Sequence, residues 1–513
     1  MVSAAAPNIL LIVADDLGTD FLRSYEPYYP DLPTDPPPPP TPALDWLADE
    51  GLLFTDCWTS PSCTPSRAQI MTGRYSHRTG MGALVLAQGS ATGLQQSEIT
   101  LPQILRKQMP AYANAAVGKW HLGPSNQPED WGHALGRPAS TDGAWFDLWA
   151  GSLYNLQTGP GSGYNRWQKT FATSIDPQLD ECGQDARMPC QILLDENTTV
   201  TPSPGEYATV DTIDDAIALI GTLPEPWFLY VAFNAPHRPA NEPAAPPYLS
   251  SCLGFTTDPT CDFDGDFKVE ARCMVQWMDN EIGRLLCDLD AEGLTDRSVV
   301  FFIGDNGTAG DRYPDGTTGV ISGAVAAPFD PDHGKGTLFQ GGVNVPMIVK
   351  GPGVVHGVCH ELVSSTDLLA TFAEVAGSPK PNHPAEDSVS FAPYLRGRRT
   401  PLRETMLVEK FGPNFIPTAN RPPANYRPTR HQRAIRDAQY KLIRNEVEAA
   451  DGSIQVVESF YNLYRPVAGG AQVDPFEQDD LRSQITPGGF TPMDRAYDQL
   501  HANMQVLSPS LFR

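Results

Sequence analysis

The chain has 513 residues and carries 61 acidic side chains against 36 lysines and arginines, a net charge of −25. Such a field repels phosphate backbones and anionic lipid surfaces, so we expect no nucleic-acid partner and no membrane partner. No apolar run approaches the roughly 20 residues that span a bilayer. The length predicts two or more domains.

The first predicted strand is the apolar run 8–14, which ends at Asp15 and Asp16. It is too short to cross a membrane, and it lacks the basic region and cleavage site of a secretory signal. We therefore expect a cytoplasmic protein. A periplasmic or secreted protein is the alternative, if a signal peptide has been removed.

The next elements are an extended stretch, a helix and a strand. The proline run 36–40 predicts polyproline II. Thr41 suits a helix N-cap and is followed by proline, so a helix is predicted from Pro42 to Glu50. A strand is predicted at 52–55.

A second helix is predicted to begin at Cys63, where Thr64 and Pro65 suit a first turn, and to end at Gly73. The positive end of a helix is expected to lower the pKa of the thiol. Structural burial is the commoner fate of a free cysteine. Thiolate phosphatases need a longer loop than the three residues that separate Cys63 from Arg67.

Three further apolar strands are predicted at 113–117, 227–233 and 298–303. Apolar residues recur at helical spacing from Met274 to Leu289, which predicts a helix. Buried strands that alternate with helices predict an α/β fold, a mostly parallel sheet with helices on both faces.

The character of the chain changes near residue 398. Short alternating segments such as 434–443 and 459–463 predict a small antiparallel sheet. We therefore divide the chain into a catalytic domain, residues 1–397, and a smaller α+β domain, residues 398–513.

Polar residues follow the ends of the predicted strands, and in open α/β sheets ligands bind at that edge. Four of them offer only oxygen ligands: Asp15, Asp16, Asp305 and Asn306. Taken singly, such pairs are more often turn or cap residues. Two pairs after apolar strands favour a cation, and oxygen ligands favour Ca²⁺, with Mg²⁺ or Mn²⁺ as alternatives.

Five cationic or proton-carrying side chains are candidate catalytic residues: Arg67, Lys119, His121, His237 and Lys335. A lone exposed lysine or histidine usually lies on the solvated surface, so these residues are functional candidates only because they occur together. Among the nine cysteines, two pairs are candidate disulfides, Cys182 with Cys190 and Cys252 with Cys261. Cys273 and Cys287 lie in the helical pattern and are predicted to be buried free thiols.

The motifs resemble those of a known family. Cys63-Thr-Pro-Ser-Arg67, followed by Thr72-Gly-Arg74, resembles the signature of the type I sulfatases, which is Cys-x-Pro-Ser-Arg with a downstream Thr-Gly-Arg. Matching stretches follow in the family's order from residue 8 to about 350: Asp15-Asp16, Thr41-Pro-Ala-Leu-Asp45, Gly118-Lys-Trp-His-Leu-Gly123, Ala235-Pro-His237, Gly304-Asp-Asn-Gly307 and Lys335-Gly-Thr-Leu-Phe-Gln-Gly-Gly342. Tyr440-Lys-Leu-Ile443 and Tyr461-Asn-Leu463 resemble its second domain. Gln340 and Asn344 stand where the family often has Glu and Arg.

The resemblance implies an alkaline-phosphatase-like fold and hydrolysis of a small-molecule sulfate ester. It implies that a formylglycine-generating enzyme converts Cys63 to formylglycine, the 3-oxoalanine whose hydrate is the nucleophile. It also implies a role for each candidate residue. Ca²⁺ would be bound by Asp15, Asp16, Asp305 and Asn306; Arg67 would orient the hydrate; Lys119 and Lys335 would bind sulfate; His121 would act as base and His237 as acid.

Two alternatives stay open at this point. One is a phosphate or phosphonate ester hydrolase of the same superfamily, against which Asn306 argues because those enzymes tend to have a histidine after the third aspartate. The other is an inactive member that only binds sulfated ligands. The organic part of the ester is not encoded in these motifs.

Overall fold

The computed structural model describes residues 6–28, 37–85, 93–95, 97–108, 110–123, 145–152, 154–156, 164–165, 169–173, 199–200, 207–242, 265–310, 324–325, 329–378, 387–418, 422–423, 426–463, 474 and 476–512. Within these ranges, no helix combines the length and the apolar character that a membrane crossing requires.

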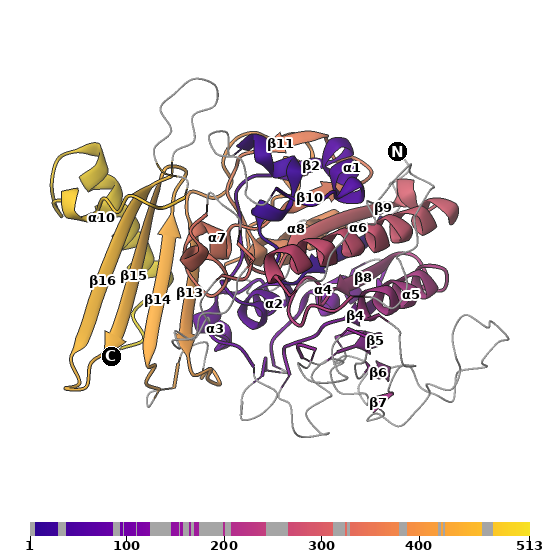
Figure 1. Ribbon diagram of the computed structural model, residues 1–513, viewed down its shortest axis with the longest axis horizontal. Coiled ribbons are helices and arrows are strands. Elements are labelled where there is room, and N and C mark those ends of the chain that lie inside the picture. The colour runs from indigo at the N-terminus through magenta and orange to yellow at the C-terminus, as the bar shows by residue number, and fades with distance from the viewer. Residues whose placement is uncertain are drawn as a thin grey trace.

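A ten-stranded sheet forms the centre of the molecule (Figure 1). Its strands lie in the order β11 (Gly357–Cys359), β2 (Leu52–Phe54), β10 (Met347–Lys350), β9 (Ser298–Gly304), β1 (Asn8–Ala14), β8 (Trp227–Ala232), β4 (Ala113–Gly118), β5 (Leu148–Gly151), β6 (Lys169–Thr173) and β7 (Thr199–Val200). Of these strands only β10 and β6 run against the others. The predicted mostly parallel sheet is confirmed.

Helices cover both faces of this sheet because its central strands alternate their apolar side chains between two cores. Leu10 and Ile12 of β1 face one core, and Ile9 and Leu11 face the other. The first core contains α1 (Pro42–Glu50), α5 (Ala208–Ile220) and α6 (Phe267–Ala291). The second contains α2 (Cys63–Thr72), α4 (Leu101–Arg106), α8 (Leu368–Val375) and α9 (Ala392–Leu395).

The remaining small elements connect these layers. They are α3 (Ser76–Thr79), α7 (Gln340–Val343), the pair β3 (Cys57–Trp58) and β12 (Val363–Ser364), and 3-10 helices at Thr19–Phe21, Arg23–Tyr28, Thr295–Arg297, Pro331–His333, Ser365–Asp367 and Arg482–Gln484. The predicted helix 42–50 is confirmed to the residue, and the helix predicted to begin at Cys63 and end at Gly73 is observed as Cys63–Thr72.

A separate antiparallel sheet follows in the C-terminal part of the chain (Figure 1). It consists of β13 (Met406–Gly412), β14 (Arg430–Arg436), β15 (Tyr440–Glu448) and β16 (Ile454–Asn462), covered by α10 (Pro492–Leu507). The predicted antiparallel sheet is confirmed, although the segment 434–443 is divided between β14 and β15. One apolar cluster joins Trp58 of β3 and Val343 of α7 to Met406 of β13, so the C-terminal sheet packs against these connecting elements. The domain boundary at 397 stays a prediction.

The prediction of free thiols at Cys273 and Cys287 is wrong, because both cysteines are disulfide-bonded. They lie 14 residues apart on α6, about 21 Å at 1.5 Å per residue, too far to bond to each other. Their partners are among Cys182, Cys190, Cys252 and Cys261, which lie outside the described residues, so the two predicted pairs cannot both form. Helical spacing identifies the packed face of α6 but does not reveal which cysteines on that helix form disulfides.

Glu458 connects the C-terminal sheet to α10. Its carboxylate accepts hydrogen bonds from Arg444 Nη1 at 2.6 Å and from the Tyr497 hydroxyl at 2.6 Å. Burial acts to raise the pKa of Glu458, but Tyr497 and Arg444 together hold it below its ordinary value of 4.5. The carboxylate therefore contributes stability in its charged form.

We expect Glu458→Gln to lower the free energy of unfolding by about 1–2 kcal/mol at neutral pH, since charge-assisted hydrogen bonds are lost. A depressed carboxyl pKa stabilises above the unfolded value and ceases to do so as pH falls through the folded one. Urea denaturation from pH 7 to pH 3 should therefore show the difference between variant and wild type shrinking below about pH 4.5. A difference independent of pH would contradict this account.

Candidate active site

Parallel register brings the ends of four strands to one edge of the sheet. Ala14 of β1 lies opposite Gly304 of β9, and Ala232 of β8 lies opposite both Val13 and Gly118 of β4. The segments that follow these strands therefore start at the same level. This is the edge at which open α/β sheets bind ligands.

Backbone hydrogen bonds continue past the strand ends and fix the first residue of each segment. The Asp305 amide donates to Ala14 O at 2.9 Å, and the Lys119 amide donates to Ala232 O at 2.7 Å. Gly118 has φ +88°, and a Cβ there would lie 1.9 Å from Ala232 O. Only glycine permits this approach, so the strand can deliver Lys119 directly beside β8.

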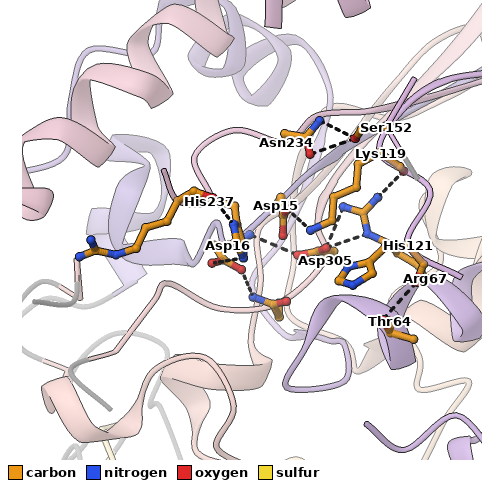
Figure 2. Close-up of polar contacts among 12 residues, drawn as sticks. Asp15, Asp16, Thr64, Arg67, Lys119, His121, Ser152, Asn234, His237 and Asp305 are labelled. Atoms are coloured by element: carbon orange, nitrogen blue, oxygen red, sulfur yellow. Dashed lines mark hydrogen bonds and ion pairs between the residues drawn. The ribbon is translucent and has the colours of Figure 1, made fainter. Parts of the chain in front are cut away.

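The four predicted metal ligands meet at this edge, where Figure 2 shows Asp15, Asp16 and Asp305 close together. The Asp16 amide donates to Asp305 Oδ1 at 3.2 Å, and Asn306 Nδ2 donates to Asp16 Oδ1 at 2.8 Å. All four side chains are buried, and Asp16 has a left-handed φ of +65°. Such backbone conformations are costly and cluster at functional sites.

Two oxygens in this group have lone pairs that could bind a cation. Asp15 Oδ1 and Asn306 Oδ1 are buried and have no hydrogen-bond partner among the described residues. Burial, with the neighbouring charge of Asp15, raises the pKa of Asp305 to about 7. Oxygen-only donors, close carboxylates and orphaned lone pairs together fit a hard divalent cation such as Ca²⁺.

Three buried cations balance the carboxylates. Lys119 Nζ pairs with Asp15 Oδ2, and Lys335 Nζ lies 2.5 Å from Asp16 Oδ1. Burial acts to lower the pKa of Lys335, but the charges of Asp16, Asp15 and Asp305 together with Cys63 outweigh it and the pKa is raised. Lys335 therefore remains charged beside the acidic group.

Arg67 is the third cation, and its guanidinium is fully buried. Its Nε and Nη2 both donate to Asp305 Oδ2, at 3.0 and 2.8 Å, and its Nη1 donates to Lys119 O at 2.8 Å. The side chain thus ties α2 to the segments after β9 and β4.

Cys63 opens α2 and lies against this charge cluster. Its Sγ and carboxylate oxygens of Asp15 and Asp305 all lie within 4.8 Å of one another. The expectation of a lowered thiol pKa is wrong, because burial raises the pKa of Cys63 to about 11 in spite of Lys119 and Lys335. Loss of hydration outweighs the helix terminus, so the residue is not an activated thiolate.

His121 is placed to accept a proton. Its Nε2 lies 2.9 Å from Val85 O, a group that can only accept, so Nε2 carries the hydrogen and Nδ1 keeps its lone pair. Nδ1 is buried without a hydrogen-bond partner among the described residues. Burial, reinforced by Lys119, lowers the pKa of His121 well below its usual value.

His237 lies on the other side of the acidic group, with Nε2 3.9 Å from Asp16 Oδ2. Its Nδ1 donates to Arg238 O at 2.6 Å, which leaves Nε2 toward the site. Burial, followed by the charge of Lys335, lowers the pKa of His237 to about 4. The imidazole is therefore neutral at rest.

The structure adds residues that sequence reasoning missed. Ser152 follows β5 and Asn234 follows β8, and their side chains are hydrogen-bonded at 3.0 and 3.2 Å beside Lys119 (Figure 2). Thr308 accepts from the Gly18 amide at 3.0 Å and so connects the two acidic segments. The signal for Ser152 was a polar residue directly after the short apolar run 148–151, which was not predicted to be a strand.

The chain matches known proteins over most of its length. The sulfatase family model matches residues 7–378. Arylsulfatase A of Bos taurus is 34% identical over 427 residues, 81% of this chain and 73% of that protein. N-acetylgalactosamine-6-sulfatase of Homo sapiens is 30% identical over 413 residues, 76% of this chain and 66% of that protein.

Solved structures agree in fold. The crystal structure of Ps i-CgsB has a TM-score of 0.64 at 22% identity and covers 98% of this chain and 94% of its own. BT4656 in complex with D-glucosamine-2-N,6-O-disulfate has a TM-score of 0.63 at 16% identity, with 99% of each chain covered. Since the family model spans residues 7–378 and the Cys-x-Pro-Ser-Arg cysteine lies within this charge cluster, the chain belongs to the sulfatase family and is an arylsulfatase-like hydrolase.

Proposed function

We propose that the protein hydrolyses sulfate monoesters through a formylglycine hydrate made from Cys63, with Ca²⁺ bound by Asp15, Asp16, Asp305 and Asn306. The observation that carries the proposal is the position of Cys63 Sγ, within 4.8 Å of the carboxylate oxygens of Asp15 and Asp305. Bound there, Ca²⁺ would neutralise the carboxylates and polarise a sulfate oxygen.

Conversion of Cys63 replaces its sulfur and two hydrogens with one oxygen, and water adds to the aldehyde to give a geminal diol. One hydroxyl would pass its proton to the Asp305 carboxylate while its oxygen attacks sulfur, and the bond from sulfur to the ester oxygen would break as that oxygen takes up a proton. The second hydroxyl then loses its proton, the bond between carbon and the sulfate oxygen breaks, and the aldehyde returns with inorganic sulfate released. A serine would stop at a stable sulfate ester, so the second hydroxyl makes the cycle complete.

The surrounding residues have matching roles. Arg67 would orient the diol, and Lys119 and Lys335 would bind the sulfate oxygens. The free lone pair of His121 Nδ1 suits removal of the second proton. Because neutral His237 carries its proton on Nδ1, the proton for the leaving oxygen would come from the charged Lys335, directly or by way of His237 Nε2.

The ester's organic part is proposed from similarity and charge. Similarity to arylsulfatase A favours an aryl sulfate of small size. The net charge of −25 disfavours a heavily sulfated polymer. The disulfides at Cys273 and Cys287 favour the periplasmic or secreted alternative over the cytoplasm, which cell fractionation would decide.

Mass spectrometry of the Cys63 peptide tests the nucleophile. We expect active enzyme to have lost sulfur and gained oxygen at this residue, and Cys63→Ser to lose at least about a thousandfold in kcat because the second step is blocked. Cys57→Ser, which changes another buried free cysteine, is the matched control. A wholly unmodified thiol in active enzyme would overturn the mechanism.

Calorimetric titration with Ca²⁺ tests the metal site. Asn306→Ala removes an orphaned oxygen, so we expect the Ca²⁺ Kd to rise at least about tenfold. Asn344→Ala is the control, since Asn344 donates to Thr55 O away from the carboxylates. Equal Ca²⁺ affinity in the two variants would remove Asn306 from the ligand set.

A substrate panel tests the reaction. We expect aryl sulfate to be hydrolysed faster than alkyl sulfate, sugar sulfate and a phosphate diester, as the similarity to arylsulfatase A suggests. Faster turnover of the phosphate diester would favour the phosphoester alternative. If the modified enzyme binds sulfate but hydrolyses none of these esters, the result would favour the alternative of an inactive member that only binds sulfated ligands.

A further inference from the structure

Three non-glycine residues among those described have a positive φ: Asp16, His121 and Glu477. The first two belong to the active site. Glu477 lies far from them in sequence, beyond the last strand of the C-terminal sheet, and has φ +58° with 2% exposure. Since such strain persists where the surroundings enforce a functional geometry, Glu477 calls for a structural reason.

The carboxylate of Glu477 joins α7 to β15 of the C-terminal sheet. Its Oε2 accepts a short hydrogen bond from the Gln340 amide, which begins α7. Its Oε1 lies 2.6 Å from Lys441 Nζ of β15, and both side chains are essentially inaccessible. Burial lowers the pKa of Lys441 to about 8 against the opposing charge of Glu477, so the ammonium there depends on its partner.

Trp58 of β3 contacts both Gln340 and Lys441. Its Nε1 donates to Gln340 Oε1 at 2.9 Å, and Lys441 Nζ lies 4.8 Å from the centre of its ring. Gln340 is thus held at its backbone by Glu477 and at its side chain by Trp58. The ion pair and the start of α7 form one buried polar unit.

A second contact from the C-terminal sheet reaches the segment before α7. Lys410 of β13 donates to Gly336 O at 2.8 Å, and the Gly336 amide donates to Pro61 O at 2.6 Å. Gly336 is the neighbour of Lys335, and Pro61 lies two residues before Cys63. The chain from Lys335 to α7 is therefore held at both ends by side chains of the C-terminal part.

We propose that Glu477, with Lys441 and Lys410, positions the sulfate-binding Lys335, so that the C-terminal sheet is a working part of the active site. None of the three is a catalytic residue, because they act through the backbone of 336–340. The inference rests on the proposed role of Lys335. A shift of about 1 Å in a binding group can cost about a hundredfold in rate. Losing the contacts that hold the 336–340 backbone should therefore weaken sulfate binding by Lys335.

The test compares Glu477→Gln with Glu458→Gln in the calcium-loaded, modified enzyme. Both changes remove a hydrogen-bonded carboxylate of the C-terminal part, but Glu458, which is 9% exposed, bonds to Arg444, Tyr497 and Arg482 rather than to the 333–344 segment. Hydrogen exchange of peptides covering 336–344 should be at least about tenfold faster in Glu477→Gln and nearly unchanged in Glu458→Gln. This readout needs no activity.

Inhibition by inorganic sulfate supplies the functional readout. We expect the sulfate Ki and the KM for an aryl sulfate to rise together, about tenfold, in Glu477→Gln and in Lys441→Met, but not in Glu458→Gln. Equal exchange and equal Ki in the two glutamine variants would overturn the proposal and leave Glu477 a merely structural residue.

The double variant Glu477→Gln/Lys441→Met guards against misfolding. It leaves no unpaired buried charge, so we expect it to be more stable than either single variant while Ki stays raised. A double variant with wild-type Ki and exchange would also overturn the proposal. If the wild type neither binds sulfate nor hydrolyses its esters, the proposed function fails, and hydrogen exchange still decides the positioning.

Discussion

The active site depends on charge balance in a place that excludes water. Parallel pairing of β1 with β9 sets Ala14 opposite Gly304, which forces the carboxylates that follow both strands into one small volume. Buried charges of like sign are tolerable only when opposite charges neutralise them. Here Arg67, Lys119 and Lys335 do so, and each comes from a different segment of the chain.

This balance explains why distant elements are locked together. Arg67 reaches from α2 to Asp305 and to the backbone after β4, and Thr308 joins the segments after β9 and β1. None of these contacts is useful alone, since each would leave a buried charge or donor unpaired. The charged residues of the candidate site therefore also hold the core elements together.

Much of this was predictable from the sequence. Apolar runs that end in acidic or cationic residues identified β1, β4, β8 and β9, because parallel strands carry their polar residues at one edge. Periodicity could not reveal β5, which is short and lies in a polar region, so Ser152 was missed. Nor could it reveal that burial outweighs the helix terminus at Cys63, because desolvation is a property of the assembled core.

The complete burial of Cys63 restricts the stage of folding at which this residue can be modified. With no accessible surface in the folded chain, the residue cannot enter another enzyme's active site unless α2 is unpacked. If Cys63 is converted to formylglycine, the converting enzyme must meet an extended segment before the sheet edge closes over it. The fraction of active molecules would then be set by a race between modification and folding, and molecules that fold first would be permanently inert although correctly shaped.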